Sequence, residues 1–181
     1  MDRKEEHKTI ERHLKVKITR NVPVSTYSFR DYFKGFEKVK AVRQIFGERT
    51  EEVLSNLKVE FAGTRGYMGV NNYDGHLLIS SNYLREGNIV DIYLDIIHEL
   101  VHVRQFMEGK ELFDDNFSYT ERPTEKEAYC HAVEEARRLG LDDDRICQYL
   151  KTEWMSVADL KRLAKTVKVR CSRFKSKDKA S

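Results

Sequence analysis

The sequence predicts an α+β fold, in which a small mixed sheet is built from about the first 82 residues and a helical part follows. Short apolar runs and an apolar–polar alternation, both typical of strands, occur in that first part of the chain. From about residue 88 onward, apolar residues instead recur at the spacing of helices. The 181 residues suffice for one sizeable core, and the 40% apolar share is that of a folded protein.

The strand-rich half begins after residues 1–12, which are charged throughout and are expected to form a flexible N-terminus. An aromatic stripe at helical spacing, with Ser28 as a cap and Gly47 as a stop, predicts a helix near 29–46. A turn-rich segment ending in Asp-Gly between two apolar runs indicates a hairpin. The elements expected here are, in chain order, a strand at 14–19, that helix, a short helix at 50–57, a strand at 58–63, and hairpin strands at 67–70 and 76–80.

The second half is predicted to be helical. Its first helix starts near Asn88 and ends at Gly109, and apolar residues cover most of its circumference, which indicates a buried central helix. A second helix is expected at 124–139, because Pro123 stands at its start and Gly140 at its end. Two further helices are expected to begin near residues 142 and 156, where acidic or capping residues occur.

Domain organisation and location follow from composition. One domain is expected over residues 13–164, followed by a basic, disordered tail over 165–181 that holds seven basic residues and one acidic residue. The cysteines, Cys130, Cys147 and Cys171, are odd in number and widely spaced, so no disulfide framework and no cysteine zinc site is expected. With no apolar run of membrane-spanning length and no secretory signal, we expect a reducing, cytoplasmic location without membrane contact.

The most informative stretch is His98-Glu99-Leu-Val-His102 in the central helix. Residues four apart lie one turn apart on a helix, so the two imidazoles are spaced to bind one zinc ion. Glu99 is rotated by roughly 100° from His98, near enough to reach a metal-bound water without being a ligand. Both histidines share a polar arc with Asp95 and Gln105, and burial without partners would be costly. Ordinary hydrogen bonds between buried histidines are the alternative interpretation.

A catalytic zinc site needs a third protein ligand and an open position. The helix after Pro123 offers Glu125 and Glu127. Glu125 lies on the apolar face, where a carboxylate must lose its water and a metal would supply the missing charge. Glu127 is expected on the solvated face, and the helix dipole alone also favours acids in a first turn. Glu125 is therefore the preferred third ligand, and Glu127 is the alternative.

These two segments resemble the two-part pattern of gluzincin-like zinc metallopeptidases, in which a Glu-x-x-Ala-Asp/Asn sequence follows the His-Glu-x-x-His motif. The small cytosolic ImmA/IrrE-like proteins are the most similar group, and the resemblance covers about residues 60–140. It implies a zincin-like fold, Zn²⁺ bound by His98, His102 and Glu125, and Glu99 as the general base. Tyr129 stands where the family pattern has Asp or Asn, which leaves the orientation of one histidine ligand unassigned.

The function expected from these features is zinc-dependent hydrolysis of peptide bonds in a protein or peptide, with Glu99 taking the proton of a zinc-bound water. Tyr119, Tyr129 and His131 are candidate donors to the oxyanion, and the sequence does not choose among them. The alternative is a non-catalytic, zincin-fold regulatory or binding protein that contacts nucleic acid through the basic tail.

Two segments are candidates for the walls of a substrate cleft. By the same resemblance, the strand at 76–80 is expected to present an edge on which an extended peptide adds as a further strand. The loop at 111–119, which is aromatic and acidic, is a candidate wall, although a plain connector is the commoner role of such a loop.

Overall fold

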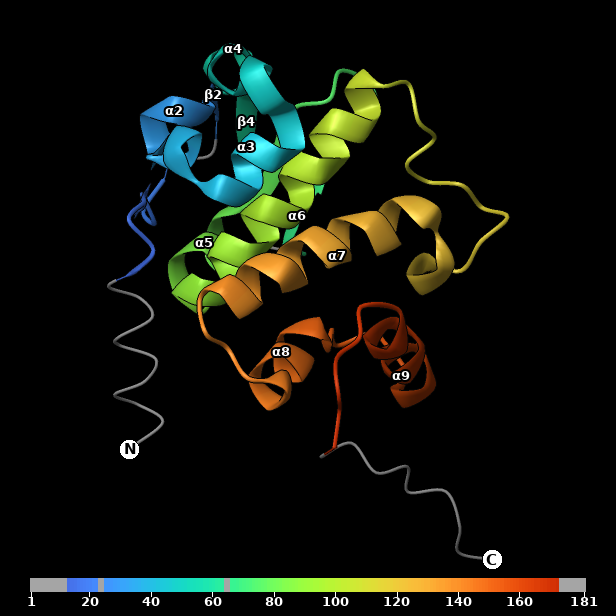
Figure 1. The fold of residues 1–181 in the computed structure, drawn as a ribbon. Helices are drawn as coiled ribbons and strands as arrows, with labels where there is room; N and C mark the ends of the chain where they lie inside the picture. The colour runs from blue at the N-terminus through green and yellow to red at the C-terminus, as the bar shows by residue number, and fades with distance from the viewer. Residues whose placement is uncertain (1–12, 23–24, 64–65, 173–181) are drawn as a thin grey trace, which may run out of the picture.

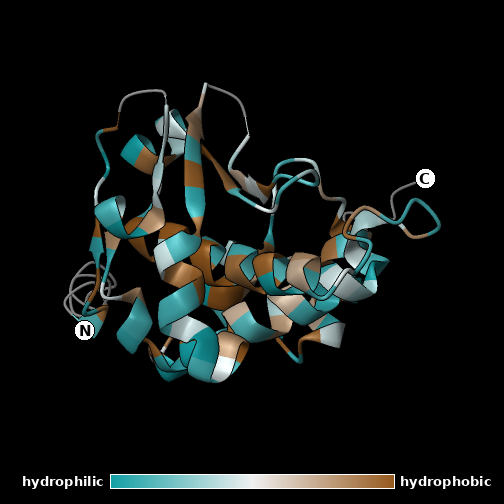
Figure 2. Cartoon of the chain, turned by 90° about the horizontal axis from the view of Figure 1, so that it is seen from above, coloured by the Kyte–Doolittle hydropathy of each residue, from teal (hydrophilic) through white to brown (hydrophobic). Residues whose placement is uncertain are grey.

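Helix α6 (Ile89–Met107) lies at the centre of the computed structural model, as Figure 1 shows. The structure describes residues 13–22, 25–63 and 66–172. Thirteen of the 19 residues of α6 are buried, which confirms the predicted central helix. Hydrophobic residues gather in the middle of the molecule and hydrophilic ones on the outward turns (Figure 2). The architecture is α+β with a small mixed sheet and mostly helical content, as the sequence predicts.

The main sheet has four strands in the order β2–β4–β6–β5. Strands β4 and β6 run parallel, with Val59 opposite Leu77, and the other two pairs are antiparallel. Strand β6 therefore has a partner on each side, and the expectation that residues 76–80 form an open edge is wrong. The edge on that side is β5, which packs against α6. The strand bounds are Thr26–Ser28 for β2, Lys58–Ala62 for β4, Met68–Val70 for β5 and Leu77–Ser80 for β6.

The single helix expected at 29–46 is wrong. The segment instead forms α2 (Phe29–Tyr32), β3 (Phe33–Lys34), the 3-10 helix η1 (Phe36–Lys38) and α3 (Lys40–Phe46). Gly35 adopts a φ of 92°, a left-handed conformation that interrupts the helix. Strand β3 pairs with β1 (Lys17–Ile18) in a separate two-stranded sheet. The aromatic residues of the stripe still enter the core, with Phe29, Phe33 and Phe36 in ring contact.

The remaining expected elements are confirmed to within a few residues. The cap side chains of Asn88, Asp142 and Ser156 accept hydrogen bonds from the first-turn amides of their helices, which fixes where those helices begin. A further helix, α5, and two 3-10 helices were not expected. The bounds are Thr50–Asn56 for α4, Ser81–Glu86 for α5, Pro123–Arg138 for α7, Asp143–Leu150 for α8, Val157–Thr166 for α9, Gly47–Arg49 for η2 and Tyr119–Glu121 for η3.

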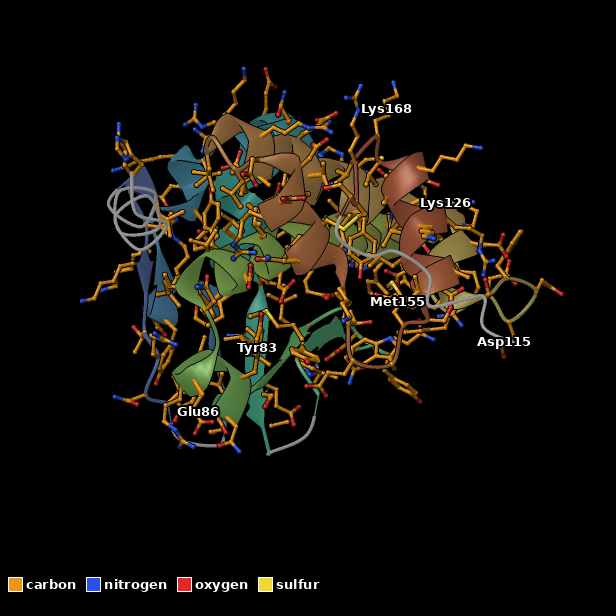
Figure 3. The ribbon with its side chains drawn as sticks, turned by 90° about the horizontal axis from the view of Figure 1, so that it is seen from below. Tyr83, Glu86, Asp115, Lys126, Met155 and Lys168 are labelled. Carbon is orange, nitrogen blue, oxygen red and sulfur yellow. A yellow bond between two sulfur atoms is a disulfide. The ribbon has the colours of Figure 1, made fainter. Side chains whose placement is uncertain are left out.

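The C-terminal segment is joined to α8 by a disulfide between Cys147 and Cys171 (Figure 3). The expectation that no disulfide forms is therefore wrong, and the cytoplasmic location, which partly depended on it, stays a prediction. Val167 and Val169 are buried, so the folded part extends beyond residue 164, where the tail was expected to begin. Residues 173–181, which hold more than half of the tail's basic residues, and residues 1–12 lie outside the described residues.

Candidate metal centre

Two histidines and a glutamate converge where α6 and α7 pack together. His98 and His102 are 5% and 6% exposed, and Glu125, in the first turn of α7, is 6% exposed. The carboxylate oxygen Glu125 Oε2 lies 3.2 Å from His98 Nε2 and 3.5 Å from His102 Nε2. The two Nε2 atoms are 3.0 Å apart. The fold thus brings together the three residues that the sequence singles out as metal ligands.

The spacing and the bonding of this group fit a metal ion. Tetrahedral zinc, with bonds of about 2.0–2.2 Å to nitrogen and oxygen, places its ligand atoms roughly 3.3 Å apart. Glu125 Oε2 is buried and makes no hydrogen bond of normal geometry among the described residues. A buried carboxylate oxygen in that state is costly, and a cation between the three atoms would stabilise it. The His–His–Glu group could therefore hold a metal ion.

Glu127, the alternative ligand, is not part of this group. Its carboxylate forms ion pairs with Arg104 and Lys110 and accepts a hydrogen bond from Gln105 Nε2 at 2.7 Å. Its side chain is 36% exposed. The helical phase of α7 explains this difference, because residues two apart point to nearly opposite sides of a helix.

The two histidines differ in what holds their rings. His102 Nδ1 lies 2.7 Å from Gln105 Oε1, an acceptor, so Nδ1 carries a proton, and Nε2 is the nitrogen left to bind a metal ion in place of its own proton. His98 Nδ1 is buried and has no hydrogen-bond partner among the described residues. The Tyr129 ring packs edge-on against the His98 ring, with centroids 4.4 Å apart. Packing against Tyr129, the residue that stands where the peptidase pattern has Asp or Asn, therefore holds the His98 ring.

Burial and neighbouring charges shift the pKa values of the group. Burial lowers the pKa of His98. Burial also acts to lower the pKa of His102, but Glu125 and Glu99 raise it to about 9. Burial acts to raise the pKa of Glu125, but the two imidazoles outweigh this effect and hold it well below its usual range. Burial raises the pKa of Glu99 to about 8, against the lowering effect of His102.

Two hollows meet at this group, and His98, Glu99 and Tyr119 line both. The front hollow, of about 170 Å³, is bounded by β5, by Leu112 and Phe113, and by Trp154. The chamber, of about 250 Å³, extends toward α5 and α8. The interpretation that the loop at 111–119 walls a cleft is confirmed for its residues Leu112, Phe113 and Tyr119.

The structure separates the three candidate oxyanion donors. The hydroxyls of Tyr119 and Tyr129 are 3.1 Å apart, and both residues line the chamber. Burial raises the pKa of each, so both stay protonated. His131 instead lines a hollow with Lys40 and Glu134, on a part of α7 that faces away from the metal group.

Sequence reasoning missed several residues that border the site. Trp154 is 59% exposed and lines both hollows, but no local pattern marks it. The edge strand Met68–Val70 borders the front hollow because of sheet order, which a single sequence does not specify. Gln105 lies three residues after His102 on the polar arc, and that spacing was the available signal for its contact.

Comparison with protein-family models, with curated proteins and with solved structures found no match to this chain. The fold and the site thus define an α+β protein with a buried His–His–Glu group that could hold a metal ion. Of the helices in the described ranges, not one combines the length and the apolar character needed to span a membrane. The resemblance to a peptidase family stays a prediction.

Proposed function

We propose that the protein is a zinc-dependent metallopeptidase of the zincin type, with His98, His102 and Glu125 as zinc ligands and Glu99 as the general base. The observation that carries the proposal is the convergence of three buried ligand atoms beside a hollow that Glu99 also lines. Structural zinc sites are closed by a fourth protein ligand, whereas catalytic sites combine three protein ligands with an open position. Among the described residues this group has three members, and it borders open space.

Zinc, when bound, would lower the pKa of water toward neutrality and polarise the peptide carbonyl. Glu99 accepts the proton of the attacking water as the oxygen–carbon bond forms, and it returns that proton to the leaving amine as the carbon–nitrogen bond breaks. Burial raises the pKa of Glu99 above its ordinary value, which makes this carboxylate a stronger acceptor for the proton that it holds between the two steps.

Tyr119 is the preferred donor to the developing oxyanion. Tyr119 lines both hollows beside Glu99, whereas Tyr129 lines the chamber and not the front hollow. The Tyr129 hydroxyl, 3.1 Å away, can orient the Tyr119 hydroxyl by a hydrogen bond. A donor held in place before the reaction stabilises charge that appears only in the transition state.

The substrate is proposed to bind as an extended chain along β5. One side of β5 pairs with β6, and the strand borders the front hollow next to His98 and Glu99. An extended peptide that adds to such an edge gains main-chain hydrogen bonds whatever its side chains. This places a peptide bond near the metal group and replaces the strand at 76–80 as the expected docking edge.

The test combines metal analysis with peptide cleavage. Protein purified without chelator is expected to hold one zinc ion per chain and to cleave members of a peptide library. Glu99→Gln should keep the zinc and lower cleavage by about 10²- to 10⁴-fold, the usual contribution of general acid–base catalysis. Failure of the wild-type protein to bind zinc would overturn the proposal. Zinc binding without any cleavage would instead favour the non-catalytic, zincin-fold alternative.

A further inference from the structure

The chamber contains an acidic group that the proposed chemistry does not use. The chamber opens off the metal group at His98 and Glu99 and is walled by α5, α6, α8 and the α8–α9 connection. Its volume of about 250 Å³ exceeds the roughly 150 Å³ that admits a benzene molecule to an apolar cavity. A long side chain of a peptide bound at the metal group can therefore enter it.

Asp95 lies inside this chamber, one helical turn before His98. It accepts a hydrogen bond from the Tyr83 hydroxyl at 2.5 Å, and no ion pair to it exists within the described part of the chain. Asp91, which also lines the chamber, differs because it forms an ion pair with Arg145. Burial raises the pKa of Asp95 to about 7, against the lowering effect of Tyr83 and Tyr149. A bound cation would stabilise its charged form.

Two further oxygen atoms of the chamber accept no hydrogen bond within the described part of the chain. Tyr149 Oη and Thr152 Oγ1 are buried and make no hydrogen bond of normal geometry to any residue in the described ranges. A hydroxyl oxygen can accept hydrogen bonds. An ammonium or guanidinium group carries only donors, three or five of them. The Tyr149 hydroxyl lowers the pKa of Asp95 by donating toward its carboxylate, which leaves the lone pairs of the hydroxyl oxygen available. The chamber therefore offers one carboxylate and two hydroxyl acceptors to a group of that kind.

The walls of the chamber also suit a cation. The Tyr67 ring contacts the rings of Tyr83 and Trp154, with centroid distances of 4.8 and 5.5 Å. Aromatic faces attract cations and pack against the methylene stems of lysine and arginine. Lys151 lines the chamber as well, but it is exposed, so solvent and salt screen its charge.

We propose that the chamber is a specificity subsite for a lysine or arginine side chain of the substrate, which packs along Tyr67 and Trp154 and pairs with Asp95. This inference deepens the proposed peptidase function and depends on it for its biological meaning. The recognition itself is a binding property that can be measured without catalysis.

The binding test uses the zinc-loaded full chain with two small ligands, N-acetyl-arginine amide and N-acetyl-citrulline amide. Citrulline keeps the shape of arginine and lacks its charge. Calorimetry is expected to show at least tenfold tighter binding of the arginine ligand, and Asp95→Asn should abolish that preference. Thr152→Val, a nearly isosteric change, should reduce the preference about threefold, and it decides the question if the Asp95 variant does not fold. Equal binding of the two ligands by the wild-type protein would overturn the proposal.

Asp115→Asn is the matched control, because it removes the same charge from a side chain that is 99% exposed. Figure 3 places Asp115 on the loop before α7, far from Tyr83. This variant should keep the full preference for arginine. A second pair of ligands, leucine amide and N-acetyl-leucine amide, tests whether the chamber takes a free N-terminus instead. If leucine amide binds more tightly than N-acetyl-arginine amide does, the assignment of the chamber to a side chain is overturned.

Cleavage separates this inference from the proposed function. Peptides that carry arginine or citrulline at each position in turn are compared by kcat/KM, and the arginine preference should occur at one position and disappear in Asp95→Asn. Equal kcat/KM values for the arginine and citrulline peptides at every position would overturn the subsite and leave the proposed peptidase function unaffected. Arginine-selective binding without cleavage of any peptide would support the binding site for the cationic side chain and overturn the proposed peptidase function.

Discussion

Gln105 joins His102 to the start of α7. Its side chain accepts a hydrogen bond from His102 Nδ1 at 2.7 Å and donates one from Nε2 to the carbonyl oxygen of Thr124, the residue before Glu125, at 3.0 Å. One fully buried side chain thus fixes the tautomer of one proposed ligand and the position of another. Such partners of metal ligands are worth roughly 10- to 100-fold in metal affinity.

Gln105→Met is accordingly expected to weaken zinc binding by about 10- to 100-fold, because His102 loses the acceptor that orients its ring. Competition with a chromophoric chelator measures the affinity. Glu127→Gln is the matched control, since it changes another partner of Gln105 and leaves the His102 contact in place. An affinity of Gln105→Met equal to that of the wild type would show that packing alone orients His102.

Glu125→Gln should weaken zinc binding more than Gln105→Met does, because it removes a charged ligand atom. Zinc at a free concentration of 100 times its Kd stabilises the folded chain by about 2.7 kcal/mol. For a chain of this size that corresponds to an increase in Tm of roughly 5–10 °C. Thermal unfolding with and without zinc should show this increase in the wild type and in Glu99→Gln. The same increase in Glu125→Gln would refute the ligand assignment.

Asp95 should make stability depend on pH. Its pKa in the folded state, about 7, lies above the ordinary value of 3.8, so the folded chain holds this proton more tightly. The resulting stability is complete below about pH 4 and is lost as the pH rises through 7. Tyr83, Tyr149 and Asp91 are the titratable groups that act on it. Between pH 5 and pH 8, urea unfolding should show the free energy of the wild type falling by about 2–3 kcal/mol relative to Asp95→Asn. A constant difference would contradict this.

The disulfide should contribute strongly to stability. Cys147 and Cys171 are 24 residues apart in sequence, and closing a loop of that length in the unfolded chain is worth about 3–4 kcal/mol. Cys171→Ser should lower the urea midpoint by a corresponding amount, and a reductant should do the same to the wild type. Cys130→Ser, a change at the free cysteine, should have little effect. Insensitivity of the wild type to reductant would indicate that the bond does not form.

The metal group was predictable because its signals are local. One helical turn fixes the relation of His98 to His102, and the helical phase of α7 separates Glu125 from Glu127. The disulfide and the β5 edge depend on contacts between distant segments, and nothing in the local pattern specifies those. The chamber likewise combines residues of α5, α6 and α8, so Asp95 could be placed on the polar arc but not given a partner.

The broken helix at 29–46 shows how one residue can override a helical pattern. The aromatic spacing is right for a helix, but Gly35 takes a left-handed φ of 92°, and a Cβ there would lie 3.0 Å from the Lys15 carbonyl oxygen. Gly35→Ala should therefore destabilise the fold by about 1–2 kcal/mol or more, from backbone strain and this contact. Gly63→Ala is the control, because its φ is not left-handed and, apart from its chain neighbours, no atom of the described residues lies within 4 Å of a Cβ at that position. Urea unfolding of the two variants makes the comparison. Equal stability would mean that the segment can adopt the continuous helix when residue 35 is alanine.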